Sequence, residues 1–266
     1  MCIRDREKIV QICIAHKVQK VIVPKYGLLS TPATSHLIRK ENAIGGIILS
    51  ASHNPGGIDG DFGVKLNISN GGPAPEIITN KIFKASQLLT SYKISKIQLP
   101  DFSKYGSYSY DETTLEIIDG LTDYSNLMEK IFDFDQISDF LKKDFSLIFD
   151  AMNAVTGPYA KNIFVEKMGL APDCVMNGNP LKDFGGLHPD PNLTYASHLA
   201  DLLLNKKSYS FGAACDGDGD RNMILGSGCF VNPSDSLAVI TANTKCVPGY
   251  KAVSYTHLTL PTICSV

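Results

Sequence analysis

Gly45-Gly-Ile-Ile-Leu-Ser-Ala-Ser-His-Asn-Pro-Gly-Gly57 is the stretch that decides how the first part of the chain is organised. Its apolar run at 47–49 predicts a buried strand. Its Asn-Pro-Gly-Gly end predicts a sharp turn, because proline fixes φ and glycine permits positive φ. We therefore expect a strand end that presents Ser52 on a loop, with His53 beside it. A serine held there can be a nucleophile or carry a phosphoryl group, although a lone Ser–His pair is more often an ordinary turn.

A second stretch, Asp216-Gly-Asp-Gly-Asp-Arg221, places three carboxylates directly after an apolar run. Asp216, Asp218 and Asp220 can converge on one hard cation if the backbone curls, and the two glycines allow that curl. Oxygen ligands favour Mg²⁺, with Mn²⁺ or Ca²⁺ as alternatives. The stretch therefore predicts a metal site with these three aspartates as ligands.

Other interpretations of the acidic stretch are weaker. An EF-hand loop needs Gly at its sixth position and Glu at its twelfth, where this chain has Arg221 and Ser227. A solvated acidic turn is disfavoured, because three carboxylates this close repel one another unless a cation lies among them. A phosphatase that uses Asp216 as its nucleophile would leave the Ser52 loop unexplained.

The chain also offers cations for a phosphate. Arg221 has a planar, permanently charged guanidinium, and Lys65 follows Ser52 by thirteen residues on a strand expected to return towards the loop. Lys65 is either a surface charge or a group that neutralises a phosphoryl group or passes a proton. His53 orients Ser52 or holds the turn, and we expect a structural or domain-contact role for His188. A bound cation, an arginine and a serine oxygen are the components of phosphoryl transfer.

Length and composition narrow the class of protein. The 266 residues correspond to one large or two medium domains, and 44% hydrophobic residues can support ordinary cores. The net charge of −2 gives no reason to expect nucleic acid or a membrane surface as partner. No apolar run approaches the ~20 residues of a transmembrane helix, and the first residues lack the apolar core of a secretory signal. Seven scattered cysteines without a C-x-x-C pair predict free thiols in a reducing cytoplasm.

The hydrophobic pattern predicts a layered α/β protein with strands and helices in alternation. Helices are expected within 7–17, at about 31–40, 75–89, 122–132 and 135–143, in a stretch ending near 168, after 192 or 194, and at 233–244. Strands are expected at 18–23, 44–49, 61–67, 115–118, 145–149, 209–215 and 223–225. Residues 91–112 are polar and poorly periodic, so we expect a loop with pieces of edge strand there.

Ser50-Ala-Ser-His-Asn-Pro-Gly-Gly57 resembles the phosphoserine loop of the α-D-phosphohexomutases, and Asp216-Gly-Asp-Gly-Asp-Arg221 resembles their magnesium loop. The detail is closest to the phosphoglucomutases, and the resemblance spans about residues 8–245. The supporting stretches, in the same order as in the family, are Gly27-Leu-Leu-Ser-Thr-Pro-Ala33, Gly60-Asp-Phe-Gly-Val-Lys-Leu-Asn67, Phe149-Asp-Ala-Met-Asn-Ala-Val-Thr-Gly-Pro-Tyr-Ala160, His188-Pro-Asp-Pro-Asn-Leu-Thr-Tyr-Ala196 and Arg221-Asn-Met-Ile-Leu-Gly226.

The resemblance implies an isomerase of carbohydrate metabolism. It implies that Ser52 carries a phosphoryl group, and that glucose 1-phosphate and glucose 6-phosphate are interconverted through glucose 1,6-bisphosphate. Arg221 and Lys65 match the positions that bind phosphate and handle protons, and His53 matches the histidine beside the phosphoserine. By the same resemblance, Mg²⁺ is expected to be bound by Asp216, Asp218 and Asp220 and by the phosphate on Ser52.

The resemblance also implies mixed sheets and two of the family's four domains. Residues 1–119 correspond to domain I with the phosphoserine loop, residues 120–232 to domain II with the magnesium loop, and residues 233–266 to the start of domain III. Residues 1–6 and about 254–266 fit no pattern, and we expect them to be non-native.

Family members are about twice as long and include a sugar-selecting loop that these residues do not match. We therefore expect this chain alone to be inactive or nearly so. We expect the full-length product to be a cytoplasmic monomer that acts on hexose phosphates. A phosphomannomutase or another hexose-phosphate mutase, and a non-catalytic mutase-like phosphoprotein, are the alternatives.

Overall fold

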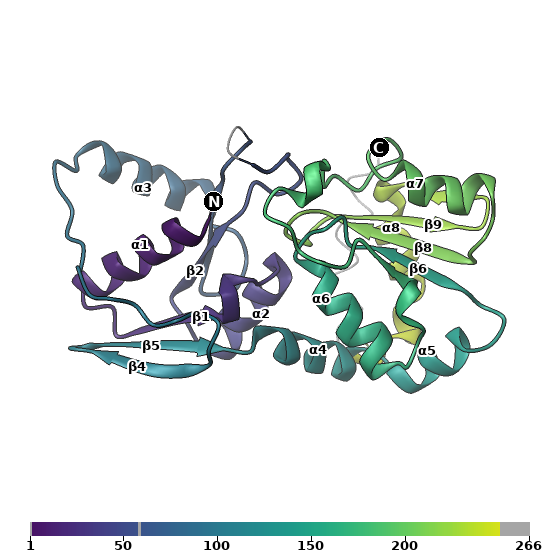
Figure 1. The fold of residues 1–266 in the computed structure, drawn as a ribbon, viewed down its shortest axis with the longest axis horizontal. Helices are drawn as coiled ribbons and strands as arrows, with labels where there is room; N and C mark the ends of the chain where they lie inside the picture. The colour runs from purple at the N-terminus through teal and green to yellow at the C-terminus, as the bar shows by residue number, and fades with distance from the viewer. Residues whose placement is uncertain (1, 58–59, 251–266) are drawn as a thin grey trace. The chain divides into compact units, whose positions relative to one another are not determined.

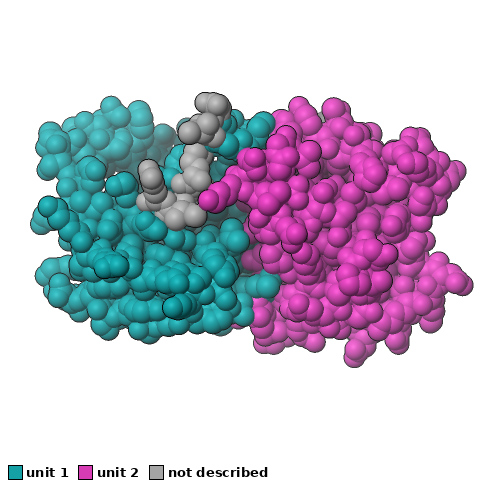
Figure 2. Space-filling view, in the orientation of Figure 1, with its two compact units in different colours: residues 1–121 teal, residues 122–266 magenta. Residues whose placement is uncertain are grey.

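The computed structural model describes residues 2–57 and 60–250, with the side chains of residues 2–4 left out. The chain divides into two compact units, Met1–Leu121 and Thr122–Val266 (Figure 2). The expected non-native stretch at 254–266 lies outside the described residues. None of the described helices is long and apolar enough to cross a membrane.

The first unit is an α/β arrangement with two separate sheets (Figure 1). One sheet has the strand order β1-β5-β4, with β1 parallel to β5 and β4 antiparallel to it. The other is the antiparallel pair β2-β3. Its elements are α1 (Cys2–Ala15), β1 (Lys20–Pro24), α2 (Thr31–Lys40), β2 (Gly45–Leu49), β3 (Val64–Ile68), α3 (Glu76–Gln87), β4 (Gly106–Tyr110) and β5 (Thr113–Ile118).

Helix α2 leads the chain into the Ser52 region. It begins at Thr31, as the expected range predicts, but its cap is Ser30 and not Thr31, the residue that the Thr-Pro pair predicts. The side chain of Ser30 accepts a hydrogen bond from the Ala33 backbone N–H at 3.2 Å, and proline lies at the start of the helix. Its apolar side buries Ala33, Leu37 and Ile38. The helix therefore has a packed face, and β2 follows it directly.

The core of the first unit lies between α1 and the β1-β5-β4 sheet. Its buried side chains are Val10, Ile14, Val23, Phe102, Leu115 and Ile117. Helix α3 forms close to where the sequence predicts it but contributes no buried residue. The region at 91–112, expected to be a loop with edge-strand pieces, supplies the complete strand β4, in which Tyr108 and Tyr110 pack partly against this core.

The second unit has one mixed five-stranded sheet in the order β10-β9-β8-β6-β7. Strand β6 is parallel to both β7 and β8, whereas β9 runs antiparallel to β8. Its strands are β6 (Leu147–Asp150), β7 (Val175–Met176), β8 (Phe211–Cys215), β9 (Asn222–Gly226) and β10 (Cys229–Val231). Its helices are α4 (Gly120–Ile131), α5 (Phe134–Leu141), α6 (Thr156–Ala160) continued by a π-helical stretch Lys161–Lys167, α7 (Ser197–Ala200) continued by Asp201–Asn205, and α8 (Pro233–Ala242).

The mixed sheets confirm the predicted fold class. Two strands of the second unit, β7 and β10, were not predicted, because two and three residues are too few for a readable alternation. The core of this sheet places Leu199 and Leu203 of the α7 stretch against Ala214, Met223 and Leu225. This packing fixes the end of β8, from which the acidic loop leaves.

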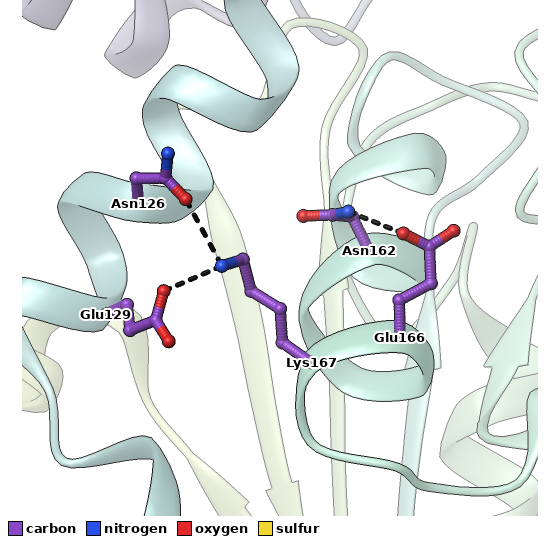
Figure 3. Close-up of polar contacts among 5 residues, drawn as sticks. All are labelled: Asn126, Glu129, Asn162, Glu166 and Lys167. Carbon is purple, nitrogen blue, oxygen red and sulfur yellow. Dashed lines mark hydrogen bonds and ion pairs between the residues drawn. The ribbon is translucent and has the colours of Figure 1, made fainter.

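A polar contact ties α4 to the π-helical stretch (Figure 3). The Lys167 Nζ atom lies 2.6 Å from Glu129 Oε2 and 3.2 Å from Asn126 Oδ1. On the π-helical stretch itself, Asn162 donates to Glu166 at 2.6 Å. Because Glu129 is about half exposed, solvent screens this ion pair.

Replacing Lys167 by methionine should therefore have only a small effect. We expect the free energy of unfolding to fall by about 0.5–1 kcal/mol, measured by urea denaturation. Lys206→Met is the matched control, because the pair between Lys206 and Asp201, at 2.7 Å, is exposed and lies within one helical turn. A loss well above ~1 kcal/mol for Lys167→Met would contradict this view of the contact.

Candidate active site

The Ser52 loop follows β2 directly, as predicted. Ser52 has a φ of 58°, which is uncommon for a residue other than glycine. Its backbone N–H donates to the Ser50 Oγ atom at 2.8 Å, and the Ser50 N–H donates to the Gly63 carbonyl at 3.0 Å. An unusual backbone conformation persists only where its surroundings fix it, and such positions gather at functional sites.

Ser50 is a contributor that the sequence interpretation missed. Its side chain accepts the hydrogen bond that holds Ser52 in the left-handed conformation. The sequence does place a serine two residues before Ser52, and short hydroxyl side chains commonly form hydrogen bonds with nearby backbone groups, so this role could have been predicted. Ser50 therefore positions the predicted nucleophile.

The return of the loop depends on glycine. A Cβ atom at Gly60 would come within 2.5 Å of the Pro55 carbonyl oxygen, so only glycine lets the two sides of the loop approach. Strand β3 then runs back along β2 and places half-buried Lys65 opposite Ile48. Ser52, His53 and Lys65 thus belong to one strand–loop–strand segment of the first unit.

The acidic loop is shaped by its own first aspartate. The Asp216 Oδ1 atom accepts hydrogen bonds from the backbone N–H groups of Gly219 at 3.0 Å, Asp220 at 3.0 Å and Arg221 at 3.1 Å. Gly219 has a φ of 76°, which is the curl expected from the glycines. Arg221, the predicted phosphate partner, is exposed at the end of this loop in the second unit.

The three predicted metal ligands lie together. One carboxylate oxygen from each of Asp216, Asp218 and Asp220 lies within 4.8 Å of the others. Asp216 and Asp218 are 0% and 3% exposed, whereas Asp220 is exposed. Three oxygen donors this close suit a hard divalent cation such as Mg²⁺ and leave positions for a further oxygen ligand.

Burial raises the pKa of Asp216 to about 6, and the charges of Asp218 and Asp220 add to this effect, while the hydrogen bond from the Arg221 backbone opposes it. A cation would relieve the same repulsion. Burial and the Asp216 charge also raise the pKa of the neighbouring Cys215 thiol to about 12. Cys215 is therefore protonated at neutral pH and is no nucleophile.

A second buried acid, Asp150, lies at the same edge of the sheet and was not predicted as a site residue. Its register partner is Ala214, two residues before Asp216. The Asp150 Oδ1 atom accepts from the Met152 N–H and from the Asn177 side chain, both at 2.8 Å. Burial raises the pKa of Asp150. The sequence feature that could have identified Asp150 is its position at the end of a buried strand, because open α/β sheets bind their ligands at that edge.

His188 stacks on Tyr195, with ring centroids 3.9 Å apart and an interplanar angle of 34°. Asn192, in the same loop, accepts from the backbone N–H groups of Thr194 and Tyr195 at 2.9 Å. These contacts give the loop its shape.

Two family profiles match the chain. The profile described as phosphoglucomutase/phosphomannomutase, alpha/beta/alpha domain I, matches residues 6–93. The profile for alpha/beta/alpha domain II of the same family matches residues 122–227.

Individual relatives agree with these profiles. The chain is 52% identical over 246 residues to a phosphoglucomutase of Rhizobium radiobacter, covering 92% of this chain and 45% of that protein. It is 50% identical to a chloroplastic phosphoglucomutase of Arabidopsis thaliana, of which it covers 40%. The chain therefore spans about half the length of the curated relatives it matches, or less.

Solved structures give the same result. The crystal structure of the Paramecium exocytosis-sensitive phosphoprotein parafusin, titled a phosphoglucomutase in its open form, superposes with a TM-score of 0.86 at 44% identity, covering 92% of this chain and 47% of that one. A putative phosphomannomutase of Thermus thermophilus gives 0.63 at 25% identity, covering 85% and 46%. With both domain profiles matched in order over most of its length, the chain belongs to the phosphoglucomutase/phosphomannomutase family.

Proposed function

We propose that the protein to which this chain belongs is a phosphoglucomutase, which interconverts glucose 1-phosphate and glucose 6-phosphate through glucose 1,6-bisphosphate. The observation that carries the proposal is the carboxylate cluster of Asp216, Asp218 and Asp220, whose oxygens lie within 4.8 Å of one another. Relatives of about 50% identity named phosphoglucomutase support the glucose sugar.

In this proposal, Ser52 Oγ carries the phosphoryl group between turnovers. The group passes to a hydroxyl of the hexose monophosphate: the bond from phosphorus to Ser52 Oγ breaks, a bond to the sugar oxygen forms, and the hydroxyl proton goes to a base. The bisphosphate reorients and returns its other phosphoryl group to Ser52. His53 orients the Ser52 phosphate, Lys65 handles the proton and binds phosphate, and Arg221 binds phosphate.

Asp216, Asp218 and Asp220, together with the phosphate on Ser52, would hold Mg²⁺. When bound, Mg²⁺ supplies positive charge that stabilises the charge on the moving phosphoryl group. The donor set fits this ion, because all of the protein ligands are hard carboxylate oxygens.

We also propose the domain assignment made from the sequence: domain I at 1–119, domain II at 120–232, and the start of a third domain from 233. The profile matches at 6–93 and 122–227 support the first two. Helix α8 buries none of its residues, and Leu237, Val239 and Ile240 are about half exposed, which supports the third. We expect little or no mutase turnover from the 266 residues alone, which cover 45% of a relative.

Mass spectrometry tests the transfer site directly. After incubation with Mg²⁺ and glucose 1,6-bisphosphate, the chain should carry one phosphoryl group on Ser52, because the serine loop and the carboxylate cluster are both formed. Asp218→Ala should abolish this labelling. Ser107→Ala, at an exposed serine of β4, is the matched control and should label as the parent does.

Two results would overturn the proposal. A phosphoryl group on Asp216 would indicate phosphatase chemistry with an aspartyl nucleophile. An unlabelled Ser52 in the folded, Mg²⁺-loaded full-length product would show that Ser52 does not carry the phosphoryl group, whereas the same result in the 266 residues alone would show only that further parts of the protein are needed for the transfer.

Two further functions compete with the proposal. A phosphomannomutase is less well supported, because the solved structure titled as one is 25% identical, against 44% for the structure titled a phosphoglucomutase. Turnover of mannose phosphates faster than glucose phosphates by the full-length product would favour it. The parafusin structure is titled both a phosphoprotein and a phosphoglucomutase. Phosphorylation of Ser52 without any turnover in the full-length product would favour a non-catalytic phosphoprotein.

For the full-length product we propose a monomer in the cytoplasm that binds hexose phosphates and neither nucleic acid nor membrane. The net charge of −2 and the scattered cysteines support this setting. The matched relatives include chloroplastic forms, so localisation of a tagged full-length product is the measurement that decides the compartment.

A further inference from the structure

The direction of the Ser52 side chain depends on where the alternation of β2 stops. Side chains along a strand alternate between its two faces, so in a continued strand Ser52 would share a face with Gly46 and Ile48. A Cβ atom at Gly46 would lie 2.9 Å from the Ile38 side chain of α2, so α2 covers this face. An extended Ser52 would therefore point towards the helix.

The backbone of Ser52 breaks this alternation. Its φ of 58° is left-handed, which is costly for a residue with a Cβ atom and persists only where the surroundings fix it. The Ser50 Oγ atom accepts the Ser52 N–H at 2.8 Å. This hydrogen bond joins the last residue on the strand to the predicted nucleophile and favours the turned conformation.

Ser50 is itself held by the residue before β3. Its N–H donates to the Gly63 carbonyl at 3.0 Å. A Cβ atom at Gly63 would collide with the Ser50 carbonyl oxygen, so only glycine lets the two backbones approach this closely. The backbone of Ser50 is therefore fixed on both its N–H and its carbonyl side.

The same register brings Ser50 near Lys65. Lys65 lies opposite Ile48, and the bond to Gly63 continues this antiparallel register to Ser50. Opposed side chains point to one face, so Ser50 and Lys65 are diagonal neighbours about 7–8 Å apart, within reach of a long side chain. The Ser50 hydroxyl thus lies between the Ser52 loop and the lysine that we propose to bind phosphate.

We propose that Ser50 is a positioning residue for phosphoryl transfer: held by Gly63, its hydroxyl aims the Ser52 Oγ atom away from the face that α2 covers. This inference rests on the proposed function. In the half-reaction with glucose 1,6-bisphosphate, the bond from phosphorus to a sugar oxygen breaks, a bond to Ser52 Oγ forms, and the Ser52 hydroxyl proton ends on the sugar oxygen. Because Ser50 acts through the Ser52 backbone, its effect falls on the rate of transfer and not on substrate binding.

Single-turnover labelling of the full-length product tests this proposal. With Mg²⁺ and saturating glucose 1,6-bisphosphate, Ser50→Ala should slow phosphorylation of Ser52 roughly 10–100-fold, the cost of a nucleophile displaced by about 1 Å. In steady-state turnover, kcat should fall while KM stays unchanged. Ser50→Thr keeps the hydroxyl acceptor and should label close to the parent rate.

Ser35→Ala is the matched control for the lost hydrogen bond. The Ser35 Oγ atom, on α2, accepts from Asn67 of β3 at 3.2 Å and donates to the Thr31 carbonyl at 3.1 Å, away from the Ser52 loop. Urea denaturation should show a loss of stability in both serine-to-alanine variants, whereas only Ser50→Ala should slow labelling.

A pair of glycine variants tests the contact that holds Ser50. Gly63→Ala should slow labelling, because the new Cβ atom displaces the Ser50 carbonyl. Gly72→Ala is its control at the other end of β3, because the nearest atom to its Cβ would be the flexible Asn70 side chain at 3.2 Å. Gly72→Ala should label as the parent does.

Three outcomes would overturn the proposal while leaving the proposed function intact. They are labelling of Ser50→Ala at the parent rate, equal slowing in Ser35→Ala, and a Ser50→Thr variant as slow as Ser50→Ala. The first would show that the hydrogen bond does not limit transfer, the second a general loss of stability, and the third an effect of packing. A full-length parent that never labels Ser52 would instead overturn the proposed function and this inference with it.

Discussion

Asp216→Ala should lower the free energy of unfolding of the metal-free chain by about 3 kcal/mol. The Asp216 Oδ1 atom accepts three backbone N–H groups at 3.0–3.1 Å, and the side chain is fully buried. The Gly219 N–H also donates to the Asp216 backbone carbonyl at 3.2 Å and keeps that bond. Removing the side-chain acceptor therefore leaves the Asp220 and Arg221 N–H groups without this bond, at a cost of roughly 1–3 kcal/mol for each one that water does not reach. Urea denaturation in the presence of a chelator measures the loss.

Asp216→Asn separates the hydrogen bonds from the charge. Asparagine keeps an oxygen acceptor for the Gly219, Asp220 and Arg221 N–H groups but removes one of three close charges. We expect the asparagine variant to be at least as stable as the parent at neutral pH without metal, while both variants lose metal binding. If Asp216→Ala unfolds at the same denaturant concentration as the parent, the loop is not organised by this side chain.

The parts of the site that the sequence predicted are those set by local chemistry. The Asp216 loop follows from carboxylates and glycines in alternation, because the spacing alone determines how closely the oxygens can approach. The position of Ser52 follows from an apolar run that ends at Asn-Pro-Gly-Gly. The start of α2 follows to within one residue from Thr31-Pro32, although the side chain that caps the helix is that of Ser30.

The parts that were not predicted depend on contacts distant in sequence. Strand β4 is polar and glycine-containing, and it becomes a strand because β5 pairs along it. Asp150 lies at the edge of the candidate site because β6 pairs with β8, which follows it by about sixty residues and leads into the acidic loop. A single sequence shows apolar periodicity but not which strands pair, so these placements required the structure.

The same limit explains α3. Its apolar residues recur at helical spacing, and the helix forms, but the spacing does not specify what the apolar side packs against. The apolar side of α3 is exposed in the described structure, and so are Ile47 and Val64 on one face of the β2-β3 pair. A correct helix prediction therefore left open what the apolar side of α3 contacts.

Mg²⁺ should stabilise the chain much more at neutral pH than at about pH 5, because ionisation of Asp216 is unfavourable in the metal-free fold. The pKa of Asp216 is about 6 in the folded chain, above its ordinary value of 3.8. Between these values the folded chain binds more protons than the unfolded chain, so metal-free stability falls as pH rises from about 4 to about 6 and levels off above that range. Each unit of pKa difference corresponds to about 1.4 kcal/mol, so the fall is on the order of 2–3 kcal/mol.

Metal reverses this trend, because Mg²⁺ binds the ionised carboxylates and must displace the proton on Asp216 at low pH. Thermal unfolding at about pH 5, 6 and 7, with chelator and with saturating Mg²⁺, measures both trends, and the gain from Mg²⁺ should grow at each step. Asp218→Asn is the control: it removes a charge that raises the pKa of Asp216, so the metal-free pH dependence should flatten as the Mg²⁺ gain disappears. If the metal-free parent and Asp218→Asn show the same change in stability from pH 5 to 7, the charge of Asp218 does not raise the pKa of Asp216, and the acidic loop does not store the repulsion that a bound cation relieves.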